Sequence, residues 1–248
     1  MNLAVFFKQY PKVGIAFSGG VDSAYLLYAA ITYGAQVRAY YVKSAFQPQF
    51  ELKDAKKLAK FLHADMRILE VDVLSDSLIT QNPATRCYHC KKKLFQKILQ
   101  EAQNDGFSVL LDGTNASDDS QDRPGMKALS ELQVLSPLRI CGLTKDEIRK
   151  RSKEAGLFTW DKPAYACLAT RIPTLTPITS SLLAKTEQAE SYLTTLGFSD
   201  FRVRLFHGGA KLQVPNAQLE RVLSYKKEIL DELKKYYSFV MLDLETRD

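Results

Sequence analysis

The sequence is poor in cysteine, histidine and tryptophan, and it has no long apolar run. Its 248 residues include 4 Cys, 3 His and 1 Trp. Four cysteines are too few for a disulfide scaffold in a chain of this size, which indicates a reducing compartment and metal or redox chemistry for paired cysteines. Nowhere do about eighteen apolar residues follow one another, and residues 1–10 show no signal-peptide pattern. We therefore expect a cytoplasmic protein without a membrane partner.

The rest of the composition is that of a folded globular protein. Hydrophobic residues make up 46% and charged residues 25%, enough to bury a core in one large or two modest domains. The net charge of +6 comes from 34 basic and 28 acidic residues. This balance suits an anionic substrate or a nucleotide. It falls short of indicating nucleic-acid binding, so tRNA is an open but disfavoured partner.

Strand-like and helical patterns alternate in the first two thirds of the chain. Such alternation predicts an α/β fold with a Rossmann-like parallel sheet, covered on both faces, that binds ligands at the carboxyl ends of its strands. The helix at 144–156 begins with Thr144 and carries Glu147 three residues on, which is a capping box. The expected strands are 13–17, 36–42, 66–71, 108–111 and 133–135, and the expected helices are 24–32, 49–63, 90–103 and 144–156.

The pattern changes after a proline-containing loop at 158–179, which is either a linker or part of the active site. A helix, two strands, a helix and a last strand follow, which predicts a small αββαβ domain. We expect a first domain over residues 1–165 and a second over 166–248. The second-domain elements are expected at 181–196, 201–206, 211–214, 216–236 and 239–242.

The segment with the clearest chemistry is 18–23, which reads Ser-Gly-Gly-Val-Asp-Ser between the first strand and the first helix. Glycines here let backbone N–H groups close on an anion, and the helix N-terminus adds partial positive charge. The pattern predicts a phosphate-binding loop. It lacks the Gly-Lys-Ser/Thr ending of the Walker loop and is not the dinucleotide Gly-x-Gly-x-x-Gly turn. An ordinary capped helix after a glycine turn is the alternative.

Two cysteines form a Cys-x-x-Cys pattern at an expected helix start. Cys87 and Cys90 lie near Arg86 and near the positive end of the helix, a setting that favours thiolates and metal ligation. One such pair is a moderate signal, because small buried cysteines are common. His89 lies inside the pattern, so a structural zinc site is an alternative.

A third cysteine, Cys167, lies in the proline-bounded loop close to Arg171, which could stabilise a thiolate or hold a phosphate. Together with Cys87 and Cys90 it could bind an iron–sulfur cluster that leaves one iron open. Cys141 has apolar and glycine neighbours and best fits a small buried hydrophobic residue.

With these residues in view, the sequence resembles the LarE-type ATP-dependent sulfur transferases, members of the ATP pyrophosphatases that carry a pyrophosphate loop (PP-loop). The resemblance covers nearly the whole chain. It implies the fold of the adenine nucleotide α-hydrolases for the first domain and a small α+β domain for substrate binding and oligomerisation. The segments that carry it are 18–23, 86–92, 112–115, 122–125, 167–173 and 201–204.

Enzymes of this family adenylylate a carboxylate of pyridinium-3,5-biscarboxylic acid mononucleotide and replace its oxygen with sulfur, in the biosynthesis of the nickel-pincer nucleotide cofactor of lactate racemase and related enzymes. A carboxylate is a poor electrophile, since oxide would have to leave. AMP provides a phosphate ester that can leave, and Mg²⁺ offsets the charge of the departing pyrophosphate. The resemblance therefore implies ATP, Mg²⁺, a mononucleotide substrate and a homo-oligomer. The implied ATP and pyrophosphate site is Ala16, Phe17, Ser18, Gly19, Gly20, Asp22, Ser23, Tyr41, Val42, Lys43, Ser44, Asp112, Gly113 and Thr114.

The source of sulfur divides the family. In one branch a single cysteine, matching Cys167, gives up its sulfur and becomes dehydroalanine. In another branch three cysteines, matching Cys87, Cys90 and Cys167, carry a [4Fe-4S] cluster whose open iron delivers sulfide, reloaded by sulfide or a donor protein. All three are present here, so we favour the cluster, with Cys167, Asp22 and Ser18 as the catalytic residues.

Arginines near the second-domain strands match the family's substrate-binding residues. Arg202 and Arg204 alternate along one strand, a spacing that points both guanidiniums to one face and suits a phosphate, with Arg171 as a third candidate. A cross-strand salt bridge is the alternative role. Glu190 is a weaker metal candidate that could equally face solvent. Residues 211–214 read Lys-Leu-Gln-Val where the family more often has Arg-Ile-Glu-Val, which puts an acidic metal or oligomer contact there in doubt.

Other function classes stay open. A tRNA thiolase would be expected to add an RNA-binding module and a stronger basic face. An amide-forming ligase would need an ammonia source or a glutaminase domain. A non-catalytic nucleotide- or zinc-binding module would bind ATP without releasing pyrophosphate.

Overall fold

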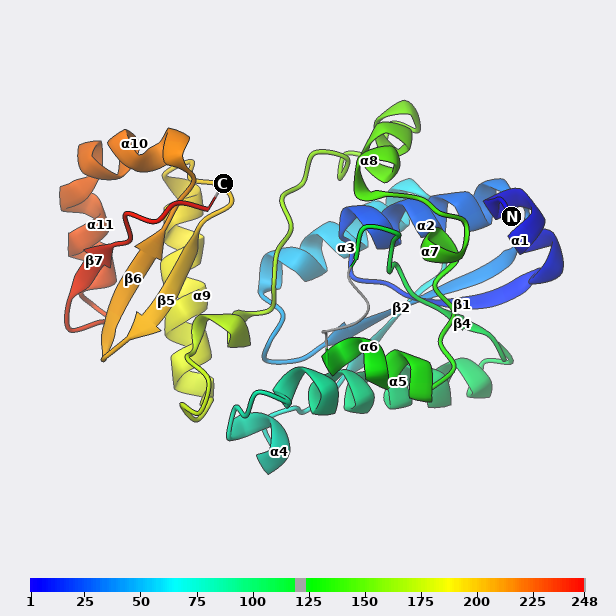
Figure 1. Ribbon diagram of the computed structural model, residues 1–248, viewed down its shortest axis with the longest axis horizontal. Helices are drawn as coiled ribbons and strands as arrows, with labels where there is room; N and C mark the ends of the chain where they lie inside the picture. The colour runs from blue at the N-terminus through cyan, green and yellow to red at the C-terminus, as the bar shows by residue number, and fades with distance from the viewer. Residues whose placement is uncertain (119–123, 248) are drawn as a thin grey trace. The chain divides into compact units, whose positions relative to one another are not determined.

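A computed structural model describes residues 1–118 and 124–247 of the chain, which folds as two compact units (Figure 1). The first unit comprises Met1–Val73 and Thr85–Lys162, and the second comprises Leu74–Ala84 and Pro163–Asp248. The second unit therefore contains a segment from the first half of the chain. The expected division into residues 1–165 and 166–248 places that segment in the first domain instead. Residues 122 and 123 of the family resemblance lie outside the described residues.

The first unit is built on a four-stranded parallel sheet in the order β3-β2-β1-β4. Because β2 and β4 flank β1 on opposite sides, the chain order reverses at β1, and ligands of such sheets bind at that switch point, outside the carboxyl ends of the strands. The predicted α/β fold with a Rossmann-like parallel sheet is confirmed. The strands are β1 Lys12–Ala16, β2 Gln36–Lys43, β3 Met66–Glu70 and β4 Leu110–Leu111.

Helices cover both faces of this sheet (Figure 1). Side chains alternate along β2, so Ala39 and Tyr41 enter one apolar layer and Tyr40 enters the other. A sheet buried on both faces explains the nearly continuous apolar strands of the sequence. One layer contains α1 Leu3–Gln9, α2 Val21–Thr32, α3 Gln49–Phe61, α7 Pro137–Ile140 and α8 Lys145–Glu154, and the other contains α5 Arg86–Asn104 and α6 Pro124–Glu131.

The second unit has a three-stranded sheet in the order β5-β6-β7, with β5 antiparallel to β6 and β6 parallel to β7. Apolar residues of its two main helices, among them Leu193 and Leu233, form one core with Val203 and Leu212 of the sheet. The predicted small α+β domain is confirmed. Its elements are α4 Ser77–Thr80, η1 Leu168–Arg171, α9 Ser180–Thr195, β5 Arg202–Phe206, β6 Gly209–Gln213, η2 Asn216–Gln218, α10 Leu219–Ser224, α11 Lys226–Leu233 and β7 Val240–Leu242.

The single helix expected at 216–236 is wrong. The chain instead forms η2, α10 and α11, with a break at Tyr225. The Ser224 hydroxyl donates to the Glu220 carbonyl, a local bond of the kind that competes with continuous helix. Apolar spacing persists across the break, because Val222 and Ile229 both enter the core, which is why the pattern alone did not reveal it.

The segment Leu74–Ala84 is joined to the second unit by one buried asparagine. Asn82 donates from its side-chain amide to the carbonyls of Pro173 and Thr176, at 2.8 and 3.1 Å, and its own carbonyl accepts from the Leu175 N–H. The Ile178 N–H donates to the Thr80 carbonyl in the same way. These bonds satisfy backbone groups that a loop buried without partners would leave unpaired.

Several elements have shorter or different forms than the patterns predict. The strand expected at 108–111 is reduced to two residues, and the one expected at 133–135 is a single bridge from Leu135 to Leu111. Helices α1, α4, α6 and α7 were not expected. None of the helices in residues 1–118 and 124–247 is long and apolar enough to cross a membrane.

Candidate active site

The predicted phosphate loop lies at the switch point of the first sheet, between β1 and α2. The Phe17 N–H donates to the Tyr40 carbonyl, which fixes where the loop leaves the strand. Inside the loop the Ser18 N–H donates to the Ser23 hydroxyl at 3.2 Å, and the two serine hydroxyls lie 3.0 Å apart. Ser18 is exposed, whereas Ser23 is buried. The loop is thus closed by its own hydroxyls at a helix N-terminus, an arrangement that suits an anion.

Two glycines are required by the way this loop packs. Gly19 has a φ of +73°, and a Cβ there would meet the backbone of Ala55 in α3 at 3.1 Å. A Cβ on Gly113, after β4, would lie 2.9 Å from the Ser23 backbone nitrogen. The turn after β4 therefore packs directly against the first turn of α2, at the carboxyl end of the sheet.

Asp22, in the first turn of α2, is held by two side chains that come from later in the sequence. Lys145 Nζ lies 2.5 Å from Asp22 Oδ2, and the Asn115 amide donates to Asp22 Oδ1 at 3.3 Å. Both charged side chains are partly exposed, 29% for Lys145 and 23% for Asp22. Lys145 is the first residue of α8, whose N-cap Thr144 accepts from the Glu147 N–H as the capping box predicted.

Asp112 follows β4 and is buried beside the loop. Its carboxylate accepts hydrogen bonds from the Thr114 hydroxyl at 2.5 Å and from the Ser136 hydroxyl at 2.6 Å. A buried carboxylate bonded to two hydroxyls is fixed in orientation, so it shapes the turn that brings Gly113 against the loop.

Residues 41–44 end β2 on the same edge of the sheet. Tyr41 is buried, its hydroxyl has no hydrogen-bond partner among the described residues, and burial raises its pKa above the ordinary value. Ser44 donates to the Gln47 side chain at 2.7 Å, and Lys43 donates to the Gln47 carbonyl. The turn at 44–47 is thus fixed by hydrogen bonds among its own residues. Ala16 and Phe17 lie at the end of β1, Val42, Lys43 and Ser44 lie at the end of β2, and Gly20 is the N-cap of α2.

The Cys-x-x-Cys pair begins helix α5 of the first unit, as expected. Cys87 is exposed in the first turn and Cys90 is half-buried three residues on, so both thiols lie on one side of the helix. An Arg86 guanidinium nitrogen lies 3.6 Å from the Cys87 sulfur. Cys141 follows helix α7, and burial raises the pKa of its thiol above the ordinary value.

Cys167 belongs to the second unit, where it caps the short helix η1. Its carbonyl accepts from the Thr170 N–H and hydroxyl, at 3.0 and 2.8 Å. All four cysteines are described, and no disulfide joins them. Within residues 1–118 and 124–247, no three His, Cys, Asp or Glu side chains are grouped closely enough to hold a metal ion.

Three arginines hold the backbone of the segment that carries Cys167. Arg171 donates to the Ala166 carbonyl, Arg202 to the Ala164 carbonyl and Arg204 to the Thr170 carbonyl, each at 2.7 Å. The sequence singled out these arginines as phosphate ligands, and it gave no sign of this second set of contacts. The Cys167 segment is therefore positioned by three cations.

Arg171 and Glu190 form a buried ion pair, with side chains 0% and 6% exposed. The carboxylate accepts from Arg171 Nε at 2.8 Å and from its terminal nitrogen at 3.0 Å. It also accepts from the Tyr165 hydroxyl and the Val203 N–H. Four donors around one carboxylate leave little room for a metal ion, so we omit Glu190 from the metal site proposed below.

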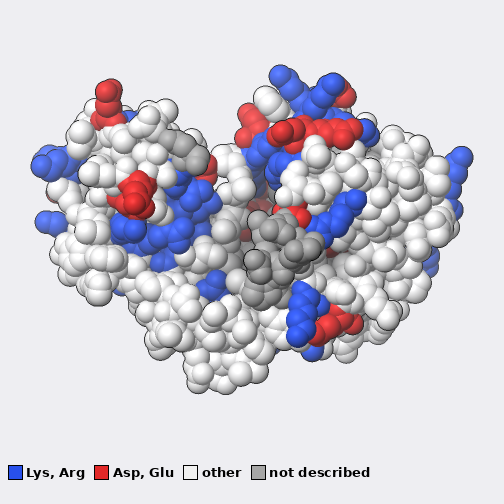
Figure 2. Space-filling view, viewed as in Figure 1, with Lys and Arg blue, Asp and Glu red and all other residues white. Residues whose placement is uncertain are grey.

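Positive charge exceeds negative charge in this buried region. Burial and the nearby Arg171 and Arg247 lower the pKa of Arg202 to about 10. The same causes, in the same order, lower the pKa of Arg204. On the adjoining strand Lys211 is paired with Arg204 in the β5–β6 register, and Figure 2 shows basic side chains gathered over these strands. Such an excess of buried cations favours an anionic ligand.

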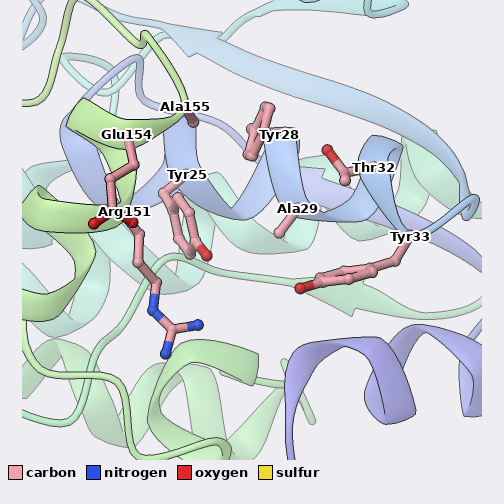
Figure 3. Close-up of a pocket in the computed structure, with 8 residues that line it drawn as sticks. All are labelled: Tyr25, Tyr28, Ala29, Thr32, Tyr33, Arg151, Glu154 and Ala155. Atoms are coloured by element: carbon pink, nitrogen blue, oxygen red, sulfur yellow. The ribbon is translucent and has the colours of Figure 1, made fainter.

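A separate pocket of about 340 Å³ lies between α2 and α8 in the first unit (Figure 3). Tyr25, Tyr33 and Arg151 are among its lining residues. Burial raises the pKa of Tyr25 above its ordinary value, and the nearby Arg151 guanidinium partly opposes this rise. The pocket follows α2 toward its C-terminal end, whereas the phosphate loop precedes the N-terminal end, so it forms no part of the phosphate site.

Lys145, Asn115 and Ser136 are the site residues that the sequence analysis did not single out for a role. Lys145 contacts a partner 123 residues away, and no local spacing connects the two. The capping box located the start of α8 but said nothing about which side chain would face the loop.

A hydroxyl- and glycine-lined loop at the β1–β4 switch point of a parallel sheet defines the class of ATP-using enzymes with a PP-loop. In agreement, the family model of the queuosine biosynthesis protein QueC matches residues 12–97, which contain this loop. A pyridinium-3,5-bisthiocarboxylic acid mononucleotide synthase of Lactiplantibacillus plantarum is 32% identical over 98% of this chain and 89% of its own. The chain belongs to the LarE family of PP-loop sulfur transferases.

Two further relatives show how far the similarity extends. An uncharacterized protein of Synechocystis is 32% identical over 98% of this chain and 92% of its own. A tRNA-specific 2-thiouridylase of Thermotoga petrophila is 30% identical, but over only 59% of this chain and 52% of its own. These relatives fit an enzyme that uses ATP and transfers sulfur.

Proposed function

We propose that this sulfur transferase adenylylates a carboxylate of a pyridinium mononucleotide and exchanges the activated oxygen for sulfur. The observation that carries the proposal is the loop at residues 18–23, closed by the Ser18 and Ser23 hydroxyls at the switch point. The substrate class is supported by the L. plantarum synthase, which is named for a pyridinium mononucleotide and is similar over nearly the whole chain.

In the first step a carboxylate oxygen attacks the α-phosphorus of ATP, and the bond to the bridging oxygen breaks, so that pyrophosphate leaves with the electron pair. Ser18, Ser23 and the backbone around Gly20 would hold the pyrophosphate, because their present bonds within the loop are weak and exchangeable. In the second step a sulfide attacks the acyl carbon and AMP leaves. Holding these donors in place before reaction lowers the cost of stabilising the departing charge.

Mg²⁺ fits the donor set of this site. It is usually bound through one or two carboxylates together with substrate phosphates, and Asp22 offers a partly exposed carboxylate at the loop. Asp22 would hold the ion, which neutralises charge on the pyrophosphate. We keep Asp22 and Ser18 as catalytic residues on this basis.

The residue types also suit an iron–sulfur cluster. Cys87, Cys90 and Cys167 supply three thiols outside any disulfide. A [4Fe-4S] cluster bound by three thiolates would supply sulfide from its open iron. Sacrifice of Cys167 is the competing source, and the Cys87 and Cys90 pair has no use in it.

We assign the substrate's phosphate to Arg202 and Arg204. Burial lowers the pKa of each, and repulsion from Arg171 and Arg247 lowers it further; a bound anion would relieve that repulsion. Arg171 enters this proposal through its ion pair with Glu190, which positions the turn that carries Cys167.

Product analysis tests the first step. With Mg²⁺, ATP and pyridinium-3,5-biscarboxylic acid mononucleotide, the protein should release AMP and pyrophosphate. Asp22→Ala should lower the rate by about 10²–10³-fold, the size of effect seen when one preorganised charge-stabilising group is removed, while its thermal unfolding stays close to that of the native chain. Formation of ADP and phosphate would show that the reaction class is wrong. If tRNA replaces the mononucleotide as the required acceptor, the protein is a tRNA thiolase of the same superfamily.

A further inference from the structure

The phosphate loop of this protein carries no positive side chain. In the Walker loop a lysine inside the motif reaches the phosphates, but residues 18–23 contain serines, glycines, a valine and an aspartate. The one charged group, Asp22, is negative. Apart from Mg²⁺, the loop therefore offers the pyrophosphate only hydroxyls, backbone N–H groups and the helix dipole, unless a positive side chain comes from elsewhere in the first unit.

Lys145 is a cation at this loop. Its ammonium lies 2.5 Å from Asp22 Oδ2, so it is within reach of a group bound at the N-terminus of α2. The structure also fixes its base, because the Lys145 N–H donates to the Ser117 hydroxyl and Thr144 caps the helix that Lys145 begins. Arg139, the other cation in this region, is held by the carbonyls of Asn115 and Asp118.

The Asp22–Lys145 pair is built so that it can exchange partners. Both side chains are partly exposed, and an ion pair of this kind contributes little stability, so breaking it costs little. Asn115 holds the other Asp22 oxygen and keeps the carboxylate aimed at the loop when the lysine leaves.

We propose that Lys145 is the phosphate-binding cation of this site, supplied from α8 in place of the lysine that the loop lacks. Without nucleotide, the Lys145 ammonium is held by Asp22. With Mg²⁺ and ATP bound, the Asp22 carboxylate turns to the metal ion and the ammonium turns to the pyrophosphate oxygens. Lys145 thereby stabilises the pyrophosphate leaving group, while Asp22 holds the metal ion. This inference rests on the proposed function.

Binding of inorganic pyrophosphate without Mg²⁺, measured by calorimetry in EDTA, separates the two roles. Lys145→Gln should weaken this binding by about tenfold or more, which corresponds to about 1.4 kcal/mol, and Lys145→Arg should restore most of it. Asp22→Asn should leave the metal-free affinity unchanged or tighter, because the lysine is released, yet it should lose the gain in affinity that Mg²⁺ gives the native chain. Lys97→Gln, which removes a similar lysine–carboxylate pair from α5, should bind as the native chain does.

The decisive outcome is that Lys145→Gln weakens the metal-free binding of pyrophosphate and Asp22→Asn does not, since loss of a merely structural ion pair would weaken binding in both variants. Equal effects of the two variants, or normal metal-free binding by Lys145→Gln, would overturn the role of Lys145 while AMP formation by the native protein upholds the proposed function. Failure of the native protein to form AMP would overturn both, whereas failure to bind pyrophosphate without Mg²⁺ while AMP still forms would overturn the role of Lys145 alone.

Discussion

Each unit of the molecule contains an ion pair, and the two pairs differ in almost every physical respect. Asp22 and Lys145 in the first unit are 23% and 29% exposed, and each partner can turn to another ligand. Arg171 and Glu190 in the second unit are 0% and 6% exposed and are surrounded by further hydrogen bonds. The first pair suits a site that must open for nucleotide. The second suits a scaffold that holds one backbone segment, and with it Cys167, in a fixed place.

The largest effect is expected for the cysteines, which come from both units. Under the cluster proposal, Cys87→Ala, Cys90→Ala and Cys167→Ala each lose iron and sulfur transfer together in protein purified without oxygen, because a cluster with one fewer thiolate is not retained. Cys141→Ala should keep both, since its thiol serves packing.

Iron analysis and intact mass after turnover check this expectation. An unchanged mass with more than one product per chain supports the cluster. Loss of the mass of H₂S at Cys167, with turnover unaffected by Cys87→Ala and Cys90→Ala, would mean that the second unit alone provides the sulfur.

The next largest effect concerns the ion pairs themselves. Arg171→Met should lower the free energy of unfolding by about 3–5 kcal/mol, because it leaves a carboxylate buried without its partner. Adding Glu190→Gln should recover part of this loss, since the uncompensated charge is then gone. Lys145→Gln should change the same quantity by less than about 1 kcal/mol.

Urea denaturation of the three variants makes the comparison. If Lys145→Gln and Arg171→Met were equally destabilising, the distinction drawn between an exchangeable and a fixed pair would be lost.

A smaller effect is expected for Arg202, which should change how the free energy of unfolding depends on pH. Its pKa of about 10 lies below the ordinary value of an arginine. Between these values the unfolded chain binds more protons than the folded one, so stability rises with pH there. The cost of burying this charge is therefore complete below pH 10 and is relieved as the pH rises through 10.

We expect the native protein to gain stability relative to Arg202→Met between pH 9 and pH values above 10. Denaturant unfolding of both proteins at each pH gives the difference, in which the titration of all other groups largely cancels. A difference that stays flat across this window would show that Arg202 has an ordinary pKa in the folded state.

The smallest effects concern two matching helix caps, one in each unit. Thr144 and Thr179 each accept a backbone N–H three residues ahead, at the starts of α8 and α9. Replacing either by alanine should cost about 1 kcal/mol of stability. Thermal unfolding should show similar losses for both, and a much larger loss for Thr144→Ala would indicate that the cap also positions Lys145.

More of the first unit than of the second could be predicted from sequence. The reason is the sequence separation between contacting residues, because local patterns reveal only short separations. Residues 18–23 carry a local pattern between a strand and a helix, and Asp112 follows the next strand, so both could be placed by strand order. Lys145 could not, because its partner is 123 residues away and nothing in its neighbourhood indicates it. The contacts of Arg202 and Arg204 with residues 164 and 170 could not be predicted for the same reason, because they depend on how β5 packs against a loop.

The attachment of Leu74–Ala84 to the second unit has a consequence for biosynthesis. Asn82 is made about ninety residues before the carbonyls that its side chain binds, at sequence separations of 90 to 94. While the chain is still being translated, this asparagine and its flanking turn remain solvated and without these hydrogen bonds until residues 172–176 leave the ribosome. The segment then closes a loop of about ninety residues, at an entropic cost that grows only slowly with loop length. The Asn82 turn is thus one of the last parts of its half of the chain to find its partners, and a chain cut after residue 162 would leave it without them.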